Sequence, residues 1–281
     1  MPPDSARARV RHYTLRHRVI AWVSRTLCDR LTYTVRHGLL QGMRRKGGLG
    51  FLPASLSGYA ETPETAFWRD LNIEGWVVYD VGAFQGLLTL YFARRARVVV
   101  SYEPQARNRR RLIENLGLNR VGNVTVRDVG IGAREGTASL VWSAAMPGGG
   151  SVDPEVGAGI ARGAHARQEI RITTLDRDIE RHSLPPPDLV KIDIEGHELA
   201  ALEGARQSLL RHRPALFLEM HGETLAQKER SAAAIVAWLE EAGYRDIRHV
   251  ETGSAINSGN CALAREGHLY CARPAAVRFR E

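Results

Sequence analysis

Short runs of β-branched residues alternate with longer segments of helical periodicity from Trp76 onward. Five runs predict strands: Val77–Val81, Val98–Tyr102, Val124–Arg127, Asp188–Asp193 and Leu216–Met220. Four segments between and after them predict helices: Leu87–Arg95, Gln105–Leu118, Leu199–Arg211 and Leu225–Ala242. This alternation is typical of an α/β fold in which a mostly parallel sheet carries helices on both faces.

The rest of the main domain predicts three more strands and one irregular segment. We expect Asp246–Val250 and His268–Ala272 to pair as an antiparallel C-terminal hairpin, and Ala138–Trp142 to form a short extra strand. Residues 146–163 are rich in glycine and contain two prolines, a composition that predicts a mobile loop. Long loops within compact domains often cover a substrate site, so we expect this one to lie over the acceptor side.

The first fifty residues form a separate segment in both pattern and charge. Apolar residues recur every fourth position from Val19 to Leu39, with arginines around them, which predicts a helix. Residues 1–50 carry a net charge of +9, whereas residues 51–281 carry a net charge of −1. We therefore expect a basic helical extension (1–50) beside the main domain (51–281). It either docks on that domain or contacts an anionic membrane surface or partner through residues 1–45.

Composition narrows the class of protein. With 44% hydrophobic and 25% charged residues among 281, the chain is ordinary for a soluble globular protein, so collagenous and wholly disordered classes are excluded. The longest apolar run, Ala232–Trp238, is far below the roughly 18 residues that a membrane-spanning helix needs. Three scattered cysteines, without a CxxC pair, exclude a disulfide framework and a cysteine-based zinc site. The expected location is cytoplasmic, at the membrane surface if the basic extension binds lipid.

The turn after the first predicted strand reads Val78-Tyr79-Asp80-Val81-Gly82-Ala83-Phe84-Gln85-Gly86. Ligands of open α/β sheets bind outside the carboxyl ends of the strands. We expect Gly82 and Gly86 to let the backbone approach a ligand, and Asp80 to accept from a cationic amino group. A dinucleotide-binding turn has glycine where Asp80 stands, and a carboxylate there would repel a pyrophosphate. This disfavours a nicotinamide-dependent oxidoreductase, which is the alternative enzyme class.

Two more acidic residues close the next strands. Glu103 ends the second predicted strand, where an acidic side chain can accept both hydroxyls of a ribose. Asp128 closes the third strand and is placed to accept from an adenine amino group, or is a solvated turn residue. The pattern thus predicts a nucleoside-containing cofactor along the first three strands.

Ionisable residues also gather at the ends of the fourth and fifth strands. Lys191, Asp193 and Glu195 are two positions apart, so they share one face of the chain. Glu219 and His221 share a face in the same way. If these two strands are neighbours, Glu219 and His221 lie beside Asp193.

These motifs together resemble the FkbM family of S-adenosylmethionine-dependent methyltransferases, over about residues 60–250. The resemblance rests on VYDVGAFQG, YEP, Thr174-Leu175-Asp176, and LVKIDIEGHELAALEGA followed by a strand ending Glu-x-His. It implies a Rossmann-like class I methyltransferase fold and, usually, O-methylation of a hydroxyl on a sugar, glycolipid or secondary metabolite. By this resemblance the cofactor positions are Asp80, Gly82, Gly86 and Glu103, and the family signature falls on Asp193, Glu195, Gly196 and Glu219.

Methyl transfer to a hydroxyl requires that the proton of the hydroxyl be removed. Asp193, Glu195 and His221 are the catalytic candidates, with His221 or Asp193 as the proton acceptor. Alternatively, Asp193, Glu219 and His221 hold a divalent cation, for which an oxygen-rich set with one imidazole suits Mg²⁺ or Mn²⁺. The expected partner is a small-molecule or glycan acceptor. A nucleic-acid methyltransferase that uses the basic extension is the third alternative, disfavoured because that segment has few aromatic residues to stack on bases.

Overall fold

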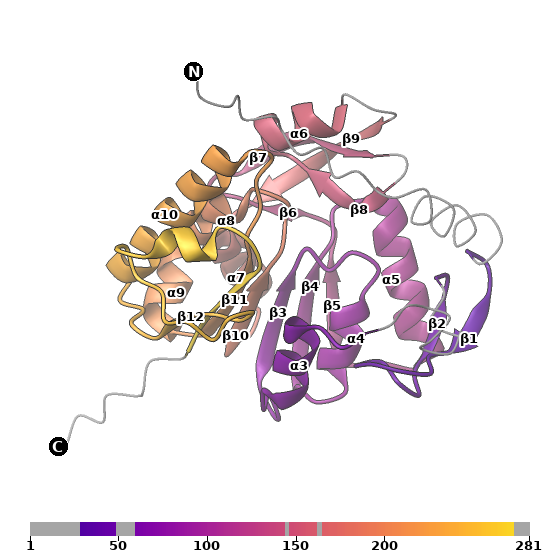
Figure 1. Cartoon of the computed structure of the whole chain (residues 1–281). Helices are drawn as coiled ribbons and strands as arrows, with labels where there is room; N and C mark the ends of the chain where they lie inside the picture. Colours follow the sequence, from indigo (N-terminus) through magenta and orange to yellow (C-terminus); the bar gives the residue numbers. More distant parts are fainter. Residues whose placement is uncertain (1–28, 49–59, 144–145, 162–164, 273–281) are drawn as a thin grey trace.

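The computed structural model describes residues 29–48, 60–143, 146–161 and 165–272. A seven-stranded sheet forms the centre of the molecule, in the order β12-β13-β11-β10-β3-β4-β5 (Figure 1). Its five parallel strands are β3 (Val77–Val81), β4 (Val98–Tyr102), β5 (Val124–Arg127), β10 (Leu189–Ile192) and β11 (Ala215–Glu219). All five strands expected from the sequence are confirmed, and β10 and β11 are direct neighbours.

The expected C-terminal hairpin is also confirmed. The strands β12 (Ile247–His249) and β13 (His268–Cys271) pair antiparallel. The strand β13 inserts between β12 and β11 and runs antiparallel to both. This places His268 directly opposite Glu219.

Helices cover both faces of the sheet, because neighbouring residues of a buried strand point to opposite sides. Tyr79 and Val190 face a core that includes side chains of α8 (Glu198–Gly204) and α10 (Leu225–Glu241). Val78 and Phe217 face the core on the other side, which includes side chains of α3 (Pro63–Asp70), α4 (Leu87–Ala93) and α5 (Ala106–Leu118). The central strands are therefore buried on both faces, as their continuous apolar runs predict.

One expected helix is split in two. The segment Leu199–Arg211 forms α8 and α9 (Arg206–His212), which meet at Ala205. The carboxylate of Asp176, in α7 (Leu175–His182), accepts from the backbone N–H groups of Gln207 and Ser208. These two bonds satisfy donors at the start of α9, so a second helix begins there.

A second sheet lies over the carboxyl ends of the central strands (Figure 1). Its strands are β6 (Gly130–Ile131), β9 (His165–Thr173), β7 (Gly136–Ser143) and β8 (Met146–Ser151), in that order. The expected strand Ala138–Trp142 is confirmed as the middle of β7.

The prediction of a mobile loop over residues 146–163 is wrong for most of that segment. Its first part is β8, paired with β7, and its second part is α6 (Pro154–Ala161). Gly150 packs closely on β7, since a Cβ there would lie 3.3 Å from the Trp142 Cβ. The Asp153 side chain accepts from the Val156 N–H and caps the helix. Glycine is thus used here for close packing. Residues 162–164 lie outside the described residues.

The helix expected in the N-terminal segment is wrong for residues 29–48. They form a hairpin of β1 (Thr32–Thr34) and β2 (Arg44–Lys46). Gly38 and Gly42 adopt positive φ between the strands, a conformation that ends a helix. Val35 is buried in the core of the main domain, and Asn115 of α5 accepts from the Lys46 N–H.

This part of the segment therefore docks on the main domain, while the expectation for residues 1–28 lies outside the described residues. Within the described ranges, no helix is long and apolar enough to cross a membrane.

Candidate active site

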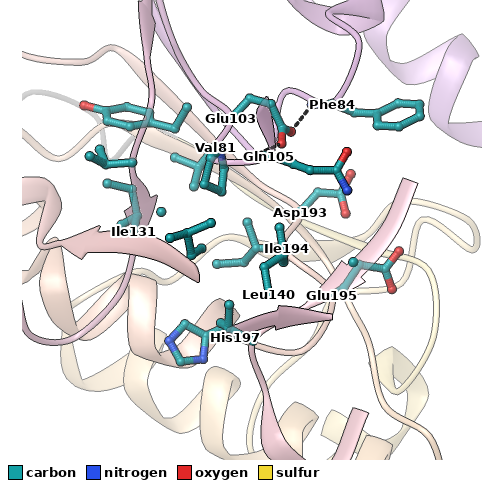
Figure 2. A pocket seen from close by; sticks show the side chains of 18 of the residues that line it. Val81, Phe84, Glu103, Gln105, Ile131, Leu140, Asp193, Ile194, Glu195 and His197 are labelled. Carbon is teal, nitrogen blue, oxygen red and sulfur yellow. Dashed lines mark hydrogen bonds between the residues drawn. The ribbon is translucent and has the colours of Figure 1, made fainter. Parts of the chain in front are cut away.

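A cavity of about 900 Å³, including its open mouth, lies between the two sheets at the carboxyl ends of β3 and β4 (Figure 2). Apolar side chains form much of its wall: Val81, Val129, Ile131, Leu140, Ile170, Ile172 and Ile194. Its polar groups include Glu103, Gln105, Asp193, Glu195 and Glu219. An apolar cavity with a few convergent polar groups is the usual form of a small-molecule site.

Glu103 is fixed in the cavity wall by backbone donors. Its Oε2 accepts from the Phe84 N–H at 2.8 Å and its Oε1 from the Gln105 N–H at 2.8 Å (Figure 2). Burial raises the pKa of this carboxyl to about 7, although the two backbone N–H groups oppose the shift. Each oxygen keeps a second lone pair, so the carboxylate can accept two hydroxyl donors from a ribose.

Gln105 carries an acceptor that the sequence analysis did not identify. The residue is 2% exposed and lines the cavity, and its Oε1 has no hydrogen-bond partner within the described part of the chain. An unsatisfied buried acceptor costs about 1–3 kcal/mol. A ligand that brings a donor to this oxygen would remove that cost.

The two glycines of the first turn serve the packing of the turn. A Cβ on Gly82 would lie 1.8 Å from the Asp193 carbonyl oxygen, and one on Gly86 would lie 2.9 Å from the Leu112 side chain. Both residues also adopt positive φ. Gly82 lines the cavity, as expected, but Gly86 does not. Gly86 is the residue at the start of α4 and packs on α5, and its expected ligand contact stays a prediction.

Asp80 does not line the cavity, and its expected contact with a cationic amino group stays a prediction. Its side chain is fully buried, and its Oδ2 accepts from the Thr89 hydroxyl at 2.6 Å. Its Oδ1 lies 3.2 Å from Lys191 Nζ, which donates to the Gly82 carbonyl at 2.9 Å and lies 3.3 Å from Asp193 Oδ2. Burial lowers the pKa of Lys191, but the two carboxylates outweigh it and hold the ammonium charged. Asp80 thus anchors Lys191, which joins the first turn to Asp193.

Asp128 lies on the surface. Its side chain is half-exposed and pairs with Arg171 at 2.8 Å, and it is not part of the cavity wall. Of the two roles expected for Asp128, its position fits that of a solvated turn residue. The adenine contact expected of Asp128 is not supported by its position.

The expected acidic and imidazole cluster is confirmed in space. Because β10 and β11 are adjacent and parallel, their ends bring Asp193, Glu195, Glu219 and His221 together. His221 Nε2 lies 3.4 Å from Glu219 Oε1, 3.5 Å from Glu195 Oε2 and 3.8 Å from Asp193 Oδ1. The three carboxylates line the cavity, whereas His221 is not among its lining residues. Their catalytic roles stay predictions.

Glu198 holds the other side of the His221 ring. Its Oε1 lies 2.9 Å from His221 Nδ1 and also accepts from the backbone N–H groups of Ile194 and Gly196. Burial lowers the pKa of His221, but its bonds to Glu198 and Glu219 outweigh burial and raise this pKa well above the ordinary value. The imidazole is fixed in orientation by partners on both ring nitrogens.

Comparison with known proteins identifies the family. A family model described as Methyltransferase FkbM domain matches residues 80–245, more than half of the chain. The chain belongs to the FkbM methyltransferase family. The match spans both parts of the cavity, from the first turn to the strand that carries Glu219.

Comparison with solved structures gives similarities of fold. An FkbM methyltransferase from Methylobacillus flagellatus is similar with a TM-score of 0.50 and 19% identity, covering 79% of this chain and 51% of that one. This chain thus spans about half the length of that protein. A putative methyltransferase from Streptococcus mutans in complex with SAH has a TM-score of 0.40 and 10% identity, covering 67% of this chain and 87% of that one. A search of curated proteins gives no match.

The FkbM domain described here therefore has a class I S-adenosylmethionine methyltransferase fold, as the sequence predicts. Membership of a methyltransferase family disfavours the alternative of a nicotinamide-dependent oxidoreductase.

Four residues in and around the site were not given a role from the sequence. Lys191 was placed on the face of Asp193 without a function, although a lysine inside an apolar strand signals a buried partner. Gln105 and Glu198 each follow an assigned residue closely in the sequence, which was the available signal. His268 gave no signal, because its contact with Glu219 depends on the insertion of β13.

Proposed function

We propose that this protein is an S-adenosylmethionine-dependent O-methyltransferase that acts on a hydroxyl group of a sugar, glycolipid or secondary metabolite. One observation carries the proposal: Glu103 and the carboxylates of Asp193, Glu195 and Glu219 line the same cavity. The cavity therefore has a nucleoside-type end and an acceptor-type end.

The nucleoside end fits the cofactor that the family uses. Glu103 offers two acceptor oxygens for ribose hydroxyls, and Gln105 Oε1 offers an acceptor for a further donor. Val129 and Ile131 give an apolar wall for a flat base. S-adenosylmethionine, when bound, supplies the electrophilic methyl group.

The acceptor end has the groups that a hydroxyl needs. Asp193, Glu195 and Glu219 can accept hydrogen bonds from several hydroxyls of one acceptor and hold it in place. Holding the reacting oxygen in line with the methyl carbon is the main work of such an enzyme. The proton of the hydroxyl leaves to Asp193, which lines the cavity. Alternatively, Asp193, Glu219 and His221 would hold a divalent cation, which would acidify the hydroxyl.

The acidic character of this end disfavours a nucleic-acid acceptor. Three carboxylates line the cavity near its acceptor end, and they would repel a phosphate backbone. A lipid-linked glycan, reached through contact of residues 1–45 with a membrane, is compatible with the same cavity.

A labelled-methyl assay tests the proposal. We expect transfer from S-adenosyl-[methyl-¹⁴C]methionine to polyhydroxyl acceptors, with a product methyl signal in NMR at the shift of an O-methyl ether. Asp193→Asn should lower kcat by at least about 100-fold. Asp70→Asn, a matched change at an exposed residue of α3, should not. A methyl group found on nitrogen, or on RNA alone, would contradict the proposal.

A further inference from the structure

We propose that Asp193, Glu219 and His221 bind one divalent cation, Mg²⁺ or Mn²⁺, and that a second set of residues holds these ligands in position. The second set is Glu198, Lys191 and the pair His268 and Glu251. The inference deepens the proposed function, on which it rests for the role of the cation as the group that binds and acidifies the acceptor hydroxyl.

The spacing of the ligand atoms fits one ion. One ligand atom from each residue lies within 4.8 Å of the others. His221 Nε2 is 3.4 Å from Glu219 Oε1 and 3.8 Å from Asp193 Oδ1. Two ligand atoms each about 2.1 Å from an ion lie roughly 3 Å apart at a right angle and about 4.2 Å apart across it. Both observed distances fall in that range.

In each of the three ligand side chains, one polar atom faces the other two ligands. The second polar atom contacts a neighbouring residue outside the set of ligands. His221 turns Nε2 to the centre, while Nδ1 lies 2.9 Å from Glu198 Oε1. A carboxylate on the second ring nitrogen is the usual support of a metal-binding histidine, because it sets the tautomer and the ring orientation. Glu198 is itself fixed by two backbone N–H groups.

The two carboxylate ligands follow the same arrangement. Asp193 Oδ1 faces His221, and its Oδ2 lies 3.3 Å from Lys191 Nζ. Glu219 Oε1 faces His221, and its Oε2 lies 3.7 Å from His268 Nε2. The other nitrogen of the His268 ring, Nδ1, lies 2.5 Å from Glu251 Oε1. These supports come from three different elements of the fold, so they are not a by-product of one turn.

Charge favours a cation at this point. Four carboxylates, those of Asp193, Glu195, Glu198 and Glu219, lie within 4 Å of the His221 ring nitrogens. Two other side chains, Lys191 and, when protonated, His268, bring positive charge into direct contact with this group of carboxylates. An excess of negative charge in a partly buried site is costly, and a divalent cation offsets it. Oxygen ligands with one imidazole suit Mg²⁺ and Mn²⁺.

Binding of Mn²⁺ alone tests the inference without the methyl-transfer reaction. The full chain is treated with EDTA, dialysed and titrated with Mn²⁺, and the free-ion signal is followed by electron paramagnetic resonance. We expect about one bound equivalent, displaced by excess Mg²⁺. Asp193→Asn and His221→Gln should each weaken binding by more than 100-fold, whereas the matched exposed variant Asp70→Asn should bind like the unmodified protein.

The supporting residues give a second, independent readout. Glu198→Gln keeps an acceptor oxygen for the Ile194 and Gly196 N–H groups but removes the charge beside His221. We expect it to weaken Mn²⁺ binding about 10–100-fold, the range found for outer residues of metal sites. Glu180→Gln, at an exposed carboxylate of α7, is the control and should have no effect. Circular dichroism and calorimetric binding of S-adenosylhomocysteine check that each variant is folded.

The inference is overturned if the unmodified protein leaves all Mn²⁺ free, or if Asp193→Asn and His221→Gln, both folded, bind Mn²⁺ normally. Should either variant fail to fold, Glu219→Gln replaces it as the test of the ligand set. Full methylation after EDTA treatment rejects the cation and leaves the proposed function intact. One bound Mn²⁺ with no methylation of any hydroxyl supports the cation and rejects the proposed function.

Discussion

Lys191 Nζ lies 3.2 Å from Asp80 Oδ1, in an ion pair whose two side chains are almost completely buried. The pair joins β3 to β10, and Lys191 continues the link to Asp193 and to the Gly82 carbonyl. The turn at the cofactor end and the carboxylate at the acceptor end are therefore positioned by one ammonium group.

We predict that Lys191→Met destabilises the protein by about 3–5 kcal/mol, because it leaves Asp80 buried without its cation. Lys228→Met, which removes an exposed pair with Glu266, should cost about 0–1 kcal/mol. Urea unfolding followed by circular dichroism measures both. Equal stabilities of the two variants would mean that the Asp80 pair does not stabilise the fold.

Glu103 should make cofactor binding depend on pH. Its pKa is about 7 in the ligand-free site, and the ionised form is the one that accepts two ribose hydroxyls. Ligand binding thus favours loss of the proton, so affinity is full above pH 7 and falls about tenfold per pH unit below it. Calorimetry with S-adenosylhomocysteine between pH 5.5 and pH 8.5 measures this.

Glu103→Gln should remove this pH dependence and lower the affinity above pH 7, at about 1.5–3 kcal/mol for each lost charged bond. Glu180→Gln should keep the profile of the unmodified protein. A profile that is flat in the unmodified protein would show that the Glu103 carboxylate does not accept from the ligand.

Gln105→Leu should change stability and affinity in opposite directions. Removal of the unsatisfied Oε1 should raise the free energy of unfolding of the ligand-free protein by up to about 1 kcal/mol. Loss of the acceptor should weaken S-adenosylhomocysteine binding by about 2–10-fold, equivalent to one neutral hydrogen bond. Thermal unfolding with and without the ligand reports both changes. Unchanged affinity would place the donor groups of the ligand elsewhere.

Gly82→Ala should disrupt the fold far more than a change at another glycine of the same backbone conformation. Its Cβ would lie 1.8 Å from the Asp193 carbonyl oxygen, which cannot move without displacing β10. Gly75→Ala has a similar positive φ and nothing within 4 Å, so it should cost only the backbone strain, about 1–2 kcal/mol. Unfolding curves of the two variants give the difference, and similar values would mean that the turn yields to the added methyl group.

The sequence alone predicted the parallel strands and the proximity of Asp193 to Glu219 and His221. It could do so because burial of a strand on both faces produces a continuous apolar run, and because the ends of parallel neighbours meet at one edge. Glu103 was found for the same reason, since the end of a strand is read directly from the end of its apolar run.

Tertiary structure decided what each polar group contacts. Asp80 was expected at the ligand. The pairing of β10 with β3 brings Lys191, which is far along the chain, into an ion pair with its carboxylate. The four-residue period up to Leu39 predicted a helix, yet Val35 is buried by contacts of the hairpin with distant residues. His268 reaches Glu219 only because β13 inserts beside β11. The periodicity of apolar residues indicates which side of a segment is buried. Which element covers that side depends on contacts between residues that are far apart in the sequence.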